Sequence, residues 1–289
     1  MASGINPPPD LVDAIFASHG ISGPWASLRA TGIANRIYAT RDVVLRLATD
    51  HREAIEDART ESVAAPAAYD AGILTPRLIA FDDSRSLIDR PFSLWERVRG
   101  ETLGLVDLGE ADVAGAWRAV GRELSKLHHR VTACPDPHGY LDHPGRELGL
   151  DTLLEEAATS GCVSIADAEE AAATISELRP HVAADGDARF IHNDIHDMNI
   201  MCSPTGALRA LIDWGDAGWG DPTLEFIAIP LEATTYALDG YESETPGALG
   251  DFAHARIIWD KLHLMLEEAW RTPGDSLRVD ALRDLLRTR

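Results

Sequence analysis

The strongest constraint on the fold is a change of hydrophobic pattern near residue 100. Before that point, short apolar runs rich in β-branched and aromatic residues predict antiparallel strands. These runs occupy residues 25–31, 35–40, 42–48, 77–81 and 91–98. After the third run, HREAIEDARTESVAA is rich in Ala, Glu and Arg and predicts a helix, with Pro66 at its kink or end. The first hundred residues therefore predict a small antiparallel sheet with one helix.

The pattern after residue 100 is mostly helical. In the segment 110–130, apolar residues recur at steps of four, three, four and three, which predicts a helix that buries one stripe. Segments 150–159 and 166–184 are also helix candidates. We therefore place a boundary near residues 96–100, with an N-terminal lobe at 1–97 and a C-terminal lobe at 98–289.

The last hundred residues mix strand and helix signals. Strand character returns between 189 and 213, with a turn at Pro204-Thr205-Gly206. Helices are expected again from 222 onward, because Asp221-Pro222 offers an N-cap aspartate followed by a first-turn proline. The stretch 239–250 predicts a loop.

Net charge narrows the class of partner. The chain carries a formal charge of −21, and residues 98–289 hold 16 Lys and Arg against 34 Asp and Glu. Nucleic acids and anionic membranes require a basic footprint, so neither is expected as a partner. A ligand that docks on the C-terminal part is expected to be cationic, although acidic surfaces also serve solubility alone. No obligate protein partner is inferred.

The sequence contains neither a membrane or targeting segment nor a paired cysteine pattern, and these two features bear on location and on disulfides. No segment reaches the roughly 18 apolar residues of a membrane helix, and the N-terminus lacks a basic stretch followed by an apolar run. We therefore expect a cytoplasmic protein. Cys134, Cys162 and Cys202 are odd in number and show no paired spacing, which argues against a disulfide framework or a Cys-based zinc site.

The segment HNDIHDMNIM (192–201) concentrates polar, mostly ionisable side chains between apolar runs. One interpretation is a metal-dependent hydrolase. If the segment were extended, His192, Asp194 and His196 would share one face and could bind zinc or manganese. No second spacing motif accompanies this pattern, although further His and Asp residues could be recruited.

The other interpretation is the catalytic loop of a phosphotransferase. A kinase needs a carboxylate that accepts the hydroxyl proton, and an Asn and a second carboxylate that bind Mg²⁺. Asp194 and Asn199 have the spacing of the kinase catalytic loop. A hairpin about Pro204-Thr205-Gly206 pairs positions whose numbers sum to about 411, so Asn199 is expected near Asp213. Two oxygen ligands side by side are what Mg²⁺ prefers.

Together with LIDWGDAGWGDP at 211–222, the segment 192–199 resembles the aminoglycoside phosphotransferase family, over roughly residues 25–270. The resemblance implies an α+β, two-lobed protein-kinase-like fold, with a small antiparallel-sheet N-lobe and a larger, mostly helical C-lobe. It implies transfer of the γ-phosphate of ATP or GTP to a hydroxyl group. It also implies that Asp194 is the catalytic base, that Asn199 and Asp213 bind Mg²⁺, and that His192 shapes the loop.

The N-lobe must supply a fixed cation for the nucleotide phosphates. No lysine precedes Lys126, so the candidate is Arg46, whose guanidinium can contact two phosphate oxygens at once. Its partner is expected to be Glu61 by its place in the family pattern. The alternative is that Glu61 is a solvent-facing charge on the helix surface. Three nearby acids could also be the partner of Arg46: Glu53, Glu56 and Asp57.

Two further N-lobe segments are assigned by the resemblance. Thr31, Gly32 and Asn35 belong to a turn like the family's polar S/T-G-x-x-N loop, whose backbone N–H groups would cradle phosphate. The strand 92–98 is the expected interlobe hinge. Its backbone would bond the purine edge at four residues: Trp95, Glu96, Arg97 and Val98.

Two departures from protein kinases concern regulation. Asn193 stands where kinases have the arginine that docks a phosphorylated loop, and the segment after Asp213 is short. We therefore expect a constitutively active kinase of small molecules. A nucleotide-binding protein that has lost its activity is disfavoured, because all three proposed catalytic and metal-binding residues are present.

Acidic residues near the C-terminus line the acceptor pocket in the family resembled. The candidates here are Glu225, Glu232, Asp260 and Glu267. Asp260 and Glu267 lie seven apart and so on one helix face, although each acid could equally be a solvated surface residue. The hypothesis is a cationic, hydroxylated acceptor such as an aminoglycoside or another basic antibiotic. Choline, homoserine, sugars, fructosamines and macrolides are acceptors of relatives, and the sequence does not choose among them.

Overall fold

The computed structural model describes residues 7–28, 35–182, 186–271 and 278–287. The chain divides into two compact units: the first contains 1–108, 133–142 and 198–217, and the second contains 109–132, 143–197 and 218–289. This division differs from the single boundary predicted near residues 96–100. The segment 198–217 belongs to the first unit, where the Leu211 N–H donates to the Leu74 carbonyl at 2.8 Å.

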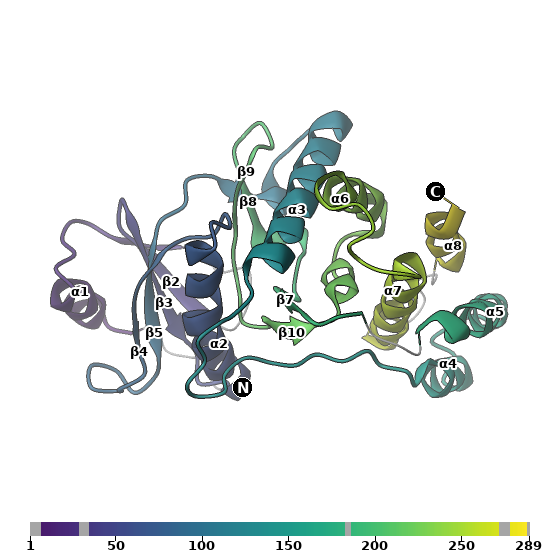
Figure 1. Cartoon of the computed structure of the whole chain (residues 1–289). Coiled ribbons are helices and arrows are strands. Elements are labelled where there is room, and N and C mark those ends of the chain that lie inside the picture. Colours follow the sequence, from purple (N-terminus) through teal and green to yellow (C-terminus); the bar gives the residue numbers. More distant parts are fainter. Residues whose placement is uncertain (1–6, 29–34, 183–185, 272–277, 288–289) are drawn as a thin grey trace. The chain divides into compact units, whose positions relative to one another are not determined.

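A five-stranded antiparallel sheet in the order β1-β2-β3-β5-β4 forms the centre of the first unit (Figure 1). Its strands are β1 (Ala26–Leu28), β2 (Asn35–Ala39), β3 (Val43–Ala48), β4 (Leu78–Asp82) and β5 (Phe92–Glu96). The small antiparallel sheet predicted from the sequence is thus confirmed, apart from the end of the first run, which lies outside the described residues.

Two helices cover opposite faces of this sheet (Figure 1). On one face, α1 (Pro9–Ser18) packs Ile15 against Leu45 and Leu47 of β3. The alternation of β3 sends Arg46 to the other face, where it meets α2 (Arg52–Asp70). Helix α1 was not predicted. Helix α2 was predicted, and of the two alternatives at Pro66, a kink or the end of the helix, the structure rules out the end, because α2 continues to Asp70.

A second, three-stranded sheet completes the first unit. It consists of β6 (Glu101–Thr102), β8 (Ile200–Cys202) and β9 (Leu208–Leu211) in the order β6-β8-β9. In the β8–β9 hairpin, Ile200 pairs with Leu211 and Met201 with Ala210, so the position numbers sum to 411. The predicted register of this hairpin is confirmed.

The second unit contains a closely packed helix pair, α3 (Glu110–Arg130) and α6 (Leu231–Glu244) (Figure 1). Two glycines permit this approach: a Cβ atom at Gly121 would lie 1.9 Å from the Ala237 carbonyl oxygen, and one at Gly240 would lie 2.1 Å from that of Arg118. The predicted loop at 239–250 is therefore wrong in its first part, where α6 continues to Glu244.

The other helices of the second unit share a separate apolar core that includes Ile175, Trp259 and Leu262. They are α4 (Leu150–Thr159), α5 (Ile165–Val182), α7 (Ala253–Arg271) and α8 (Val279–Arg287). A short antiparallel pair, β7 (Arg189–Ile191) with β10 (Gly218–Gly220), precedes the 3-10 helix η3 (Pro222–Phe226). The Asp221 side chain accepts the Thr223 N–H at the start of η3, as predicted for an N-cap.

Over the described residues, three antiparallel sheets, one of them only two strands wide, and eight α-helices make an α+β protein of the predicted class. Over the ranges that the structure describes, helices long and apolar enough to traverse a lipid bilayer do not occur.

Candidate active site

Arg46 is the cation at the centre of the first unit's polar cluster. Its Nη1 binds Glu61 Oε1 from α2, and its Nη2 lies 2.5 Å from Asp213 Oδ1. Burial alone would lower the pKa of Arg46, but the carboxylates of Asp213 and Glu61 outweigh it and raise that pKa. The predicted pairing of Arg46 with Glu61 is confirmed. Of the competing acids, Glu56 binds Arg52 on the exposed side of α2.

Among the described residues, more carboxylates than cations act on Glu61 and Asp57, two acids near Arg46. Burial is the main cause that raises the pKa of Glu61, against the opposing pull of Arg46. Burial also raises the pKa of Asp57 to about 6, and the charges of Asp216 and Asp213 add to it. One guanidinium thus faces several acids that repel one another. A second cation at this place would relieve that repulsion.

Asn199 and Asp213 lie at the open end of the β8–β9 hairpin. The Ile212 N–H donates to the Asn199 backbone carbonyl at 3.0 Å, which carries the strand pairing to the residue before Asp213. Asp213 has a φ of 69°, a left-handed conformation that costs a non-glycine residue about 1–3 kcal/mol. An amide and a carboxylate from one hairpin end offer the oxygen donors that suit Mg²⁺.

Both residues line a cavity of about 370 Å³ within the first unit. Its apolar walls include Ile37, Val44, Met198 and Ile212, and its polar wall includes Arg46 and Glu61. The predicted hinge residues Trp95, Glu96, Arg97 and Val98 all line the same cavity. Apolar walls beside fixed charges suit a nucleotide, which has an aromatic base and an anionic tail.

The hydrogen bonds of the hinge restrict which backbone groups can meet a base. The Glu96 N–H donates to the Arg77 carbonyl and the Arg97 N–H to the Asp42 carbonyl, each at 2.9 Å. Asn35 begins β2 and pairs with Ala48. The predicted phosphate-binding residues Thr31 and Gly32 lie outside the described residues.

Asp194 belongs to the second unit, in an irregular loop that follows β7. Its side chain is 33% exposed, and its Oδ2 lies 3.6 Å from His196 Nε2. On its other side the His196 ring faces Asp197, with Nδ1 3.8 Å from Oδ1. Contact with Asp194 raises the pKa of His196 above 6.5, although partial burial opposes that rise. The proposed base therefore keeps solvent access, and its contact with His196 favours the protonated form of that ring.

Glu225 holds this loop from inside the protein. It is 1% exposed; its Oε1 accepts the His192 N–H at 2.7 Å and its Oε2 accepts the Asn193 N–H at 2.9 Å. Asn193 has a φ of 66°, which asparagine tolerates better than most residues. We predicted that Glu225 would bind the acceptor, but its carboxylate is buried and engaged, so we remove it from the acceptor site. No local sequence pattern marked this long-range contact.

Asp260 is the second predicted acceptor residue that the structure places in the interior. It is 4% exposed and receives both Nε and Nη2 of Arg146, each at 2.9 Å. Arg146 also binds Asp221 at 3.2 Å. The helix spacing of Asp260 and Glu267 was correct, but Asp260 faces a buried arginine instead of a ligand, and Glu267 is half-buried.

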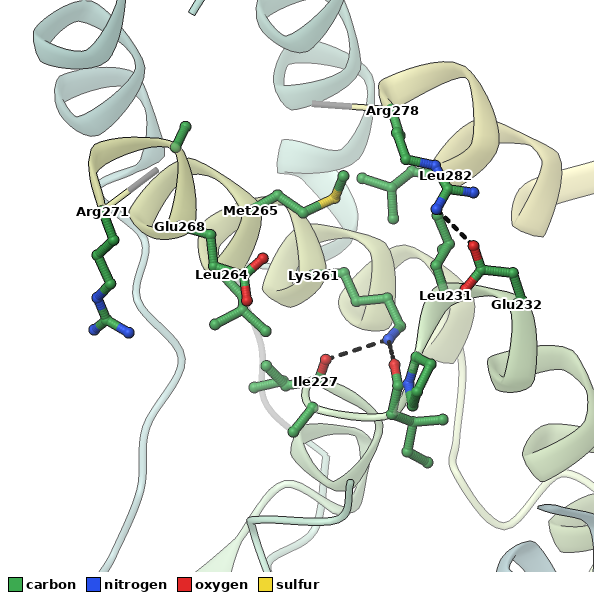
Figure 2. A pocket seen from close by; sticks show the side chains of 14 residues that line it. Ile227, Leu231, Glu232, Lys261, Leu264, Met265, Glu268, Arg271, Arg278 and Leu282 are labelled. Atoms are coloured by element: carbon green, nitrogen blue, oxygen red, sulfur yellow. Dashed lines mark hydrogen bonds and ion pairs between the residues drawn. The ribbon is translucent and has the colours of Figure 1, made fainter. Parts of the chain in front are cut away.

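A second cavity, of about 760 Å³, lies in the second unit beside the turn 227–232, α7 and α8 (Figure 2). Of the predicted acids, Glu232 lines it, with its Oε1 2.5 Å from Arg278 Nη1. Glu268, Lys261 and Arg271 also line it, among apolar side chains. The cavity thus mixes both charges with apolar surface.

Lys261 is the most unusual residue of this cavity. It is 4% exposed, and its Nζ donates to the backbone carbonyls of Ile227 at 3.2 Å and Ile229 at 2.6 Å (Figure 2). Burial is the main cause that lowers its pKa to about 7. No pattern in the sequence indicated a role for this lysine.

The metal-hydrolase alternative finds no support in the geometry. Within the ranges described, no group of three or more His, Cys, Asp and Glu side chains is arranged to hold a metal ion. β7 ends at Ile191, and the left-handed Asn193 breaks the alternation that would put His192, Asp194 and His196 on one face.

Comparisons with known proteins agree on the fold. No curated protein sequence matches the chain. The macrolide 2′-phosphotransferase MphH from Brachybacterium faecium is 16% identical, with a TM-score of 0.61 over 98% of this chain and 99% of that one. The GDP complex of aminoglycoside 2′-phosphotransferase-IIIa is 17% identical, with a TM-score of 0.63 over 98% of each chain.

A third similar structure is the streptomycin and ATP complex of APH(2″)-IIa, 14% identical, with a TM-score of 0.61 over 99% of this chain and 98% of that one. These similarities show a protein-kinase-like fold. Residues 26–265 match the Phosphotransferase enzyme family. Because that match spans most of the sequence, the chain belongs to the Phosphotransferase enzyme family.

Proposed function

We propose that this protein is a Mg²⁺-dependent kinase that transfers the γ-phosphate of ATP or GTP to a hydroxyl group of a small, cationic molecule. The observation that carries the proposal is the grouping of Arg46, Glu61, Asn199 and Asp213 around one cavity of the first unit. That grouping combines a fixed cation for phosphates with oxygen donors for a metal ion.

The nucleotide is assigned to this cavity. Its base would lie against the apolar walls, and the Val98 N–H is the hinge donor that we assign to the purine edge, because the Glu96 and Arg97 N–H groups are already engaged. Arg46 would bind the phosphates. Asn199 and Asp213 would hold Mg²⁺, whose charge would neutralise phosphate oxygens and the surplus of carboxylates.

Asp194 is assigned as the base. The acceptor oxygen forms a bond to the γ-phosphorus, the bond to the β,γ-bridging oxygen breaks, and the acceptor proton passes to the Asp194 carboxylate. The nucleoside diphosphate leaves with the bridging oxygen. Because Asn193 replaces the arginine that docks a phosphorylated loop in protein kinases, the enzyme is proposed to act without such activation.

The acceptor is assigned to the cavity of the second unit. The support is that this cavity and the loop of Asp194 are linked through η3. Glu225 of η3 binds the backbone next to Asp194, and Ile227, two residues after Glu225, lines the cavity. Glu268 and the exposed carboxylate of Glu232, which binds Arg278 in this structure, would meet amino groups, as in an aminoglycoside or another basic antibiotic. Choline, homoserine, sugars and macrolides remain alternative acceptors. A cytoplasmic location remains a prediction from the sequence.

The test is phosphate transfer from labelled ATP and GTP to a panel of aminoglycosides, macrolides, amino alcohols and sugars. We expect Mg²⁺-dependent transfer that Asp194→Ala abolishes and Asp187→Ala, the same change at an exposed acid of the second unit, preserves. Zinc-dependent activity that needs no nucleotide, or full transfer by Asp194→Ala, would overturn the proposal. Transfer only to neutral or acidic acceptors would overturn the cationic part.

A further inference from the structure

The peptide that precedes the proposed base is held by a buried carboxylate. The two oxygens of Glu225 accept the consecutive N–H groups of His192 and Asn193, so the carboxylate fixes the orientation of both peptides. Asp194 is the next residue. Any rotation of the Glu225 carboxylate would therefore turn the backbone from which the Asp194 side chain projects.

A buried carboxylate needs its own partners to stay in one orientation. His128 of α3 supplies one: its Nε2 lies 3.2 Å from Glu225 Oε1, and both side chains have no exposed surface. Since a carboxylate accepts two N–H groups here, His128 Nε2 must be the protonated nitrogen that donates to it. This bond restrains Oε1 of Glu225, the same oxygen that accepts the His192 N–H.

The other nitrogen of the same ring is engaged by Tyr241 of α6. His128 Nδ1 lies 2.8 Å from Tyr241 Oη, and Tyr241 is buried. With the proton of a neutral imidazole on Nε2, Nδ1 accepts the Tyr241 O–H. Burial raises the pKa of Tyr241, with the Glu225 charge as a further cause, so the phenol keeps the proton that it donates.

We propose that Tyr241 and His128 are positioning residues for the base, acting through Glu225 on the backbone of the catalytic loop. This inference rests on the proposed function, because it takes Asp194 as the base. The hydrogen bonds from Tyr241 to His128 and from His128 to Glu225 anchor the loop to the helix pair α3 and α6. The glycines at the contact of these two helices allow them to pack closely. Neither His128 nor Tyr241 needs to touch a substrate to affect the rate.

The two nitrogens of the His128 ring predict different kcat values for different substitutions at this position. A residue that only fills space would not produce this difference. In His128→Gln the side-chain amide N–H takes the place of Nε2–H, whereas in His128→Asn it takes the place of Nδ1. We expect His128→Asn to lower kcat by roughly ten- to a hundredfold, the range for a small misplacement of a reacting group, with little change in the KM for the nucleotide. His128→Gln should restore most of kcat, and Tyr241→Phe should lower it less than His128→Asn does.

The chain offers a matched control in the same helix pair. Ser125 Oγ of α3 and Thr245 Oγ1, just after α6, lie 2.6 Å apart, one helical turn from His128 but without a link to Glu225. Ser125→Ala removes a hydrogen bond of similar length and should leave kcat unchanged.

The experiment measures Mg²⁺-dependent hydrolysis of ATP and GTP, and transfer to kanamycin, for the folded variants at one temperature below their melting points. Loss of kcat in His128→Asn, recovery in His128→Gln and no loss in Ser125→Ala support the inference. Equal kcat in His128→Asn and the wild type overturns it, as does equal loss in His128→Asn and Ser125→Ala. Asp194→Asn in the same assay separates the two proposals, since full activity in that variant overturns the proposed function itself.

Discussion

Replacing Lys261 by methionine should change how the stability of the protein depends on pH. The lysine is enclosed by the cavity wall of the second unit, and burial lowers its pKa from 10.5 to about 7. The unfolded chain therefore binds more protons than the folded protein between these two values. Stability should rise with pH across this window, and the full penalty of the buried charge should be present below pH 7.

The size of the effect follows from the same two pKa values. At about 1.4 kcal/mol for each pH unit between the folded and unfolded pKa, the protonated lysine costs roughly 4–5 kcal/mol at neutral pH and below. Most of that cost, about 3–4 kcal/mol, should disappear by pH 10. Methionine keeps the length of the side chain and removes the charge, but it leaves the carbonyls of Ile227 and Ile229 without this donor. That loss, about 1–3 kcal/mol for each group, is the same at every pH.

The assay is urea unfolding, monitored by tryptophan fluorescence between pH 5 and 10. It compares the wild type, Lys261→Met and, as the control at the other lysine, Lys126→Met. The free energy of unfolding of Lys261→Met relative to the wild type should fall by about 3–4 kcal/mol from pH 7 to pH 10. It should be constant below pH 6. A difference that stays constant from pH 6 to pH 10, or that tracks the control, would refute the argument that burial governs the charge of Lys261.

Substitutions at three further positions test separate parts of the structure. Arg46→Ala should destabilise the fold by about 3–5 kcal/mol, because it removes the cation that binds the buried carboxylate of Glu61, and Arg46→Lys should retain more nucleotide binding than Arg46→Ala; equal melting temperatures for wild type and Arg46→Ala in calorimetry would contradict this. Asp260→Ala should cost about 3 kcal/mol or more, because it removes one of the two carboxylates that bind the buried charge of Arg146; a raised acceptor KM with an unchanged melting temperature would instead restore Asp260 to the acceptor site. Gly121→Ala should cost about 2 kcal/mol or more in urea unfolding, since its methyl group would overlap the Ala237 carbonyl; a neutral effect would show that α3 and α6 can separate freely.

The parts of the site that the sequence predicted correctly depend on short-range rules. The hairpin register followed from one turn, and it brought Asn199 to the residue before Asp213. The pairing of Arg46 with Glu61 followed from a strand position and a helix position fixed by the family pattern. Such features need only local geometry or a motif, and the sequence contains both.

The wrong predictions have a different cause. Burial of a side chain and contacts with residues far away in the sequence cannot be recognised from the neighbouring residues. Glu225 and Asp260 look like other helix acids in the sequence, yet one binds backbone N–H groups of the catalytic loop and the other binds Arg146. The polar stretch after 239 looked like a loop, but Gly240 lies where α6 touches α3 and the helix continues. In each case a contact more than thirty residues away decided the outcome.

The most direct test of the central claim is the binding of Mn²⁺ in place of Mg²⁺, measured by electron paramagnetic resonance of free Mn²⁺ with and without ATP or GTP. The proposed function predicts that nucleotide strengthens Mn²⁺ binding, and that Asn199→Ala and Asp213→Asn each weaken it by about tenfold or more. His192→Ala and His196→Ala should weaken it far less. Unchanged binding in Asn199→Ala and Asp213→Asn, with loss in the two histidine variants, would contradict the assignment and return the metal to the histidine cluster.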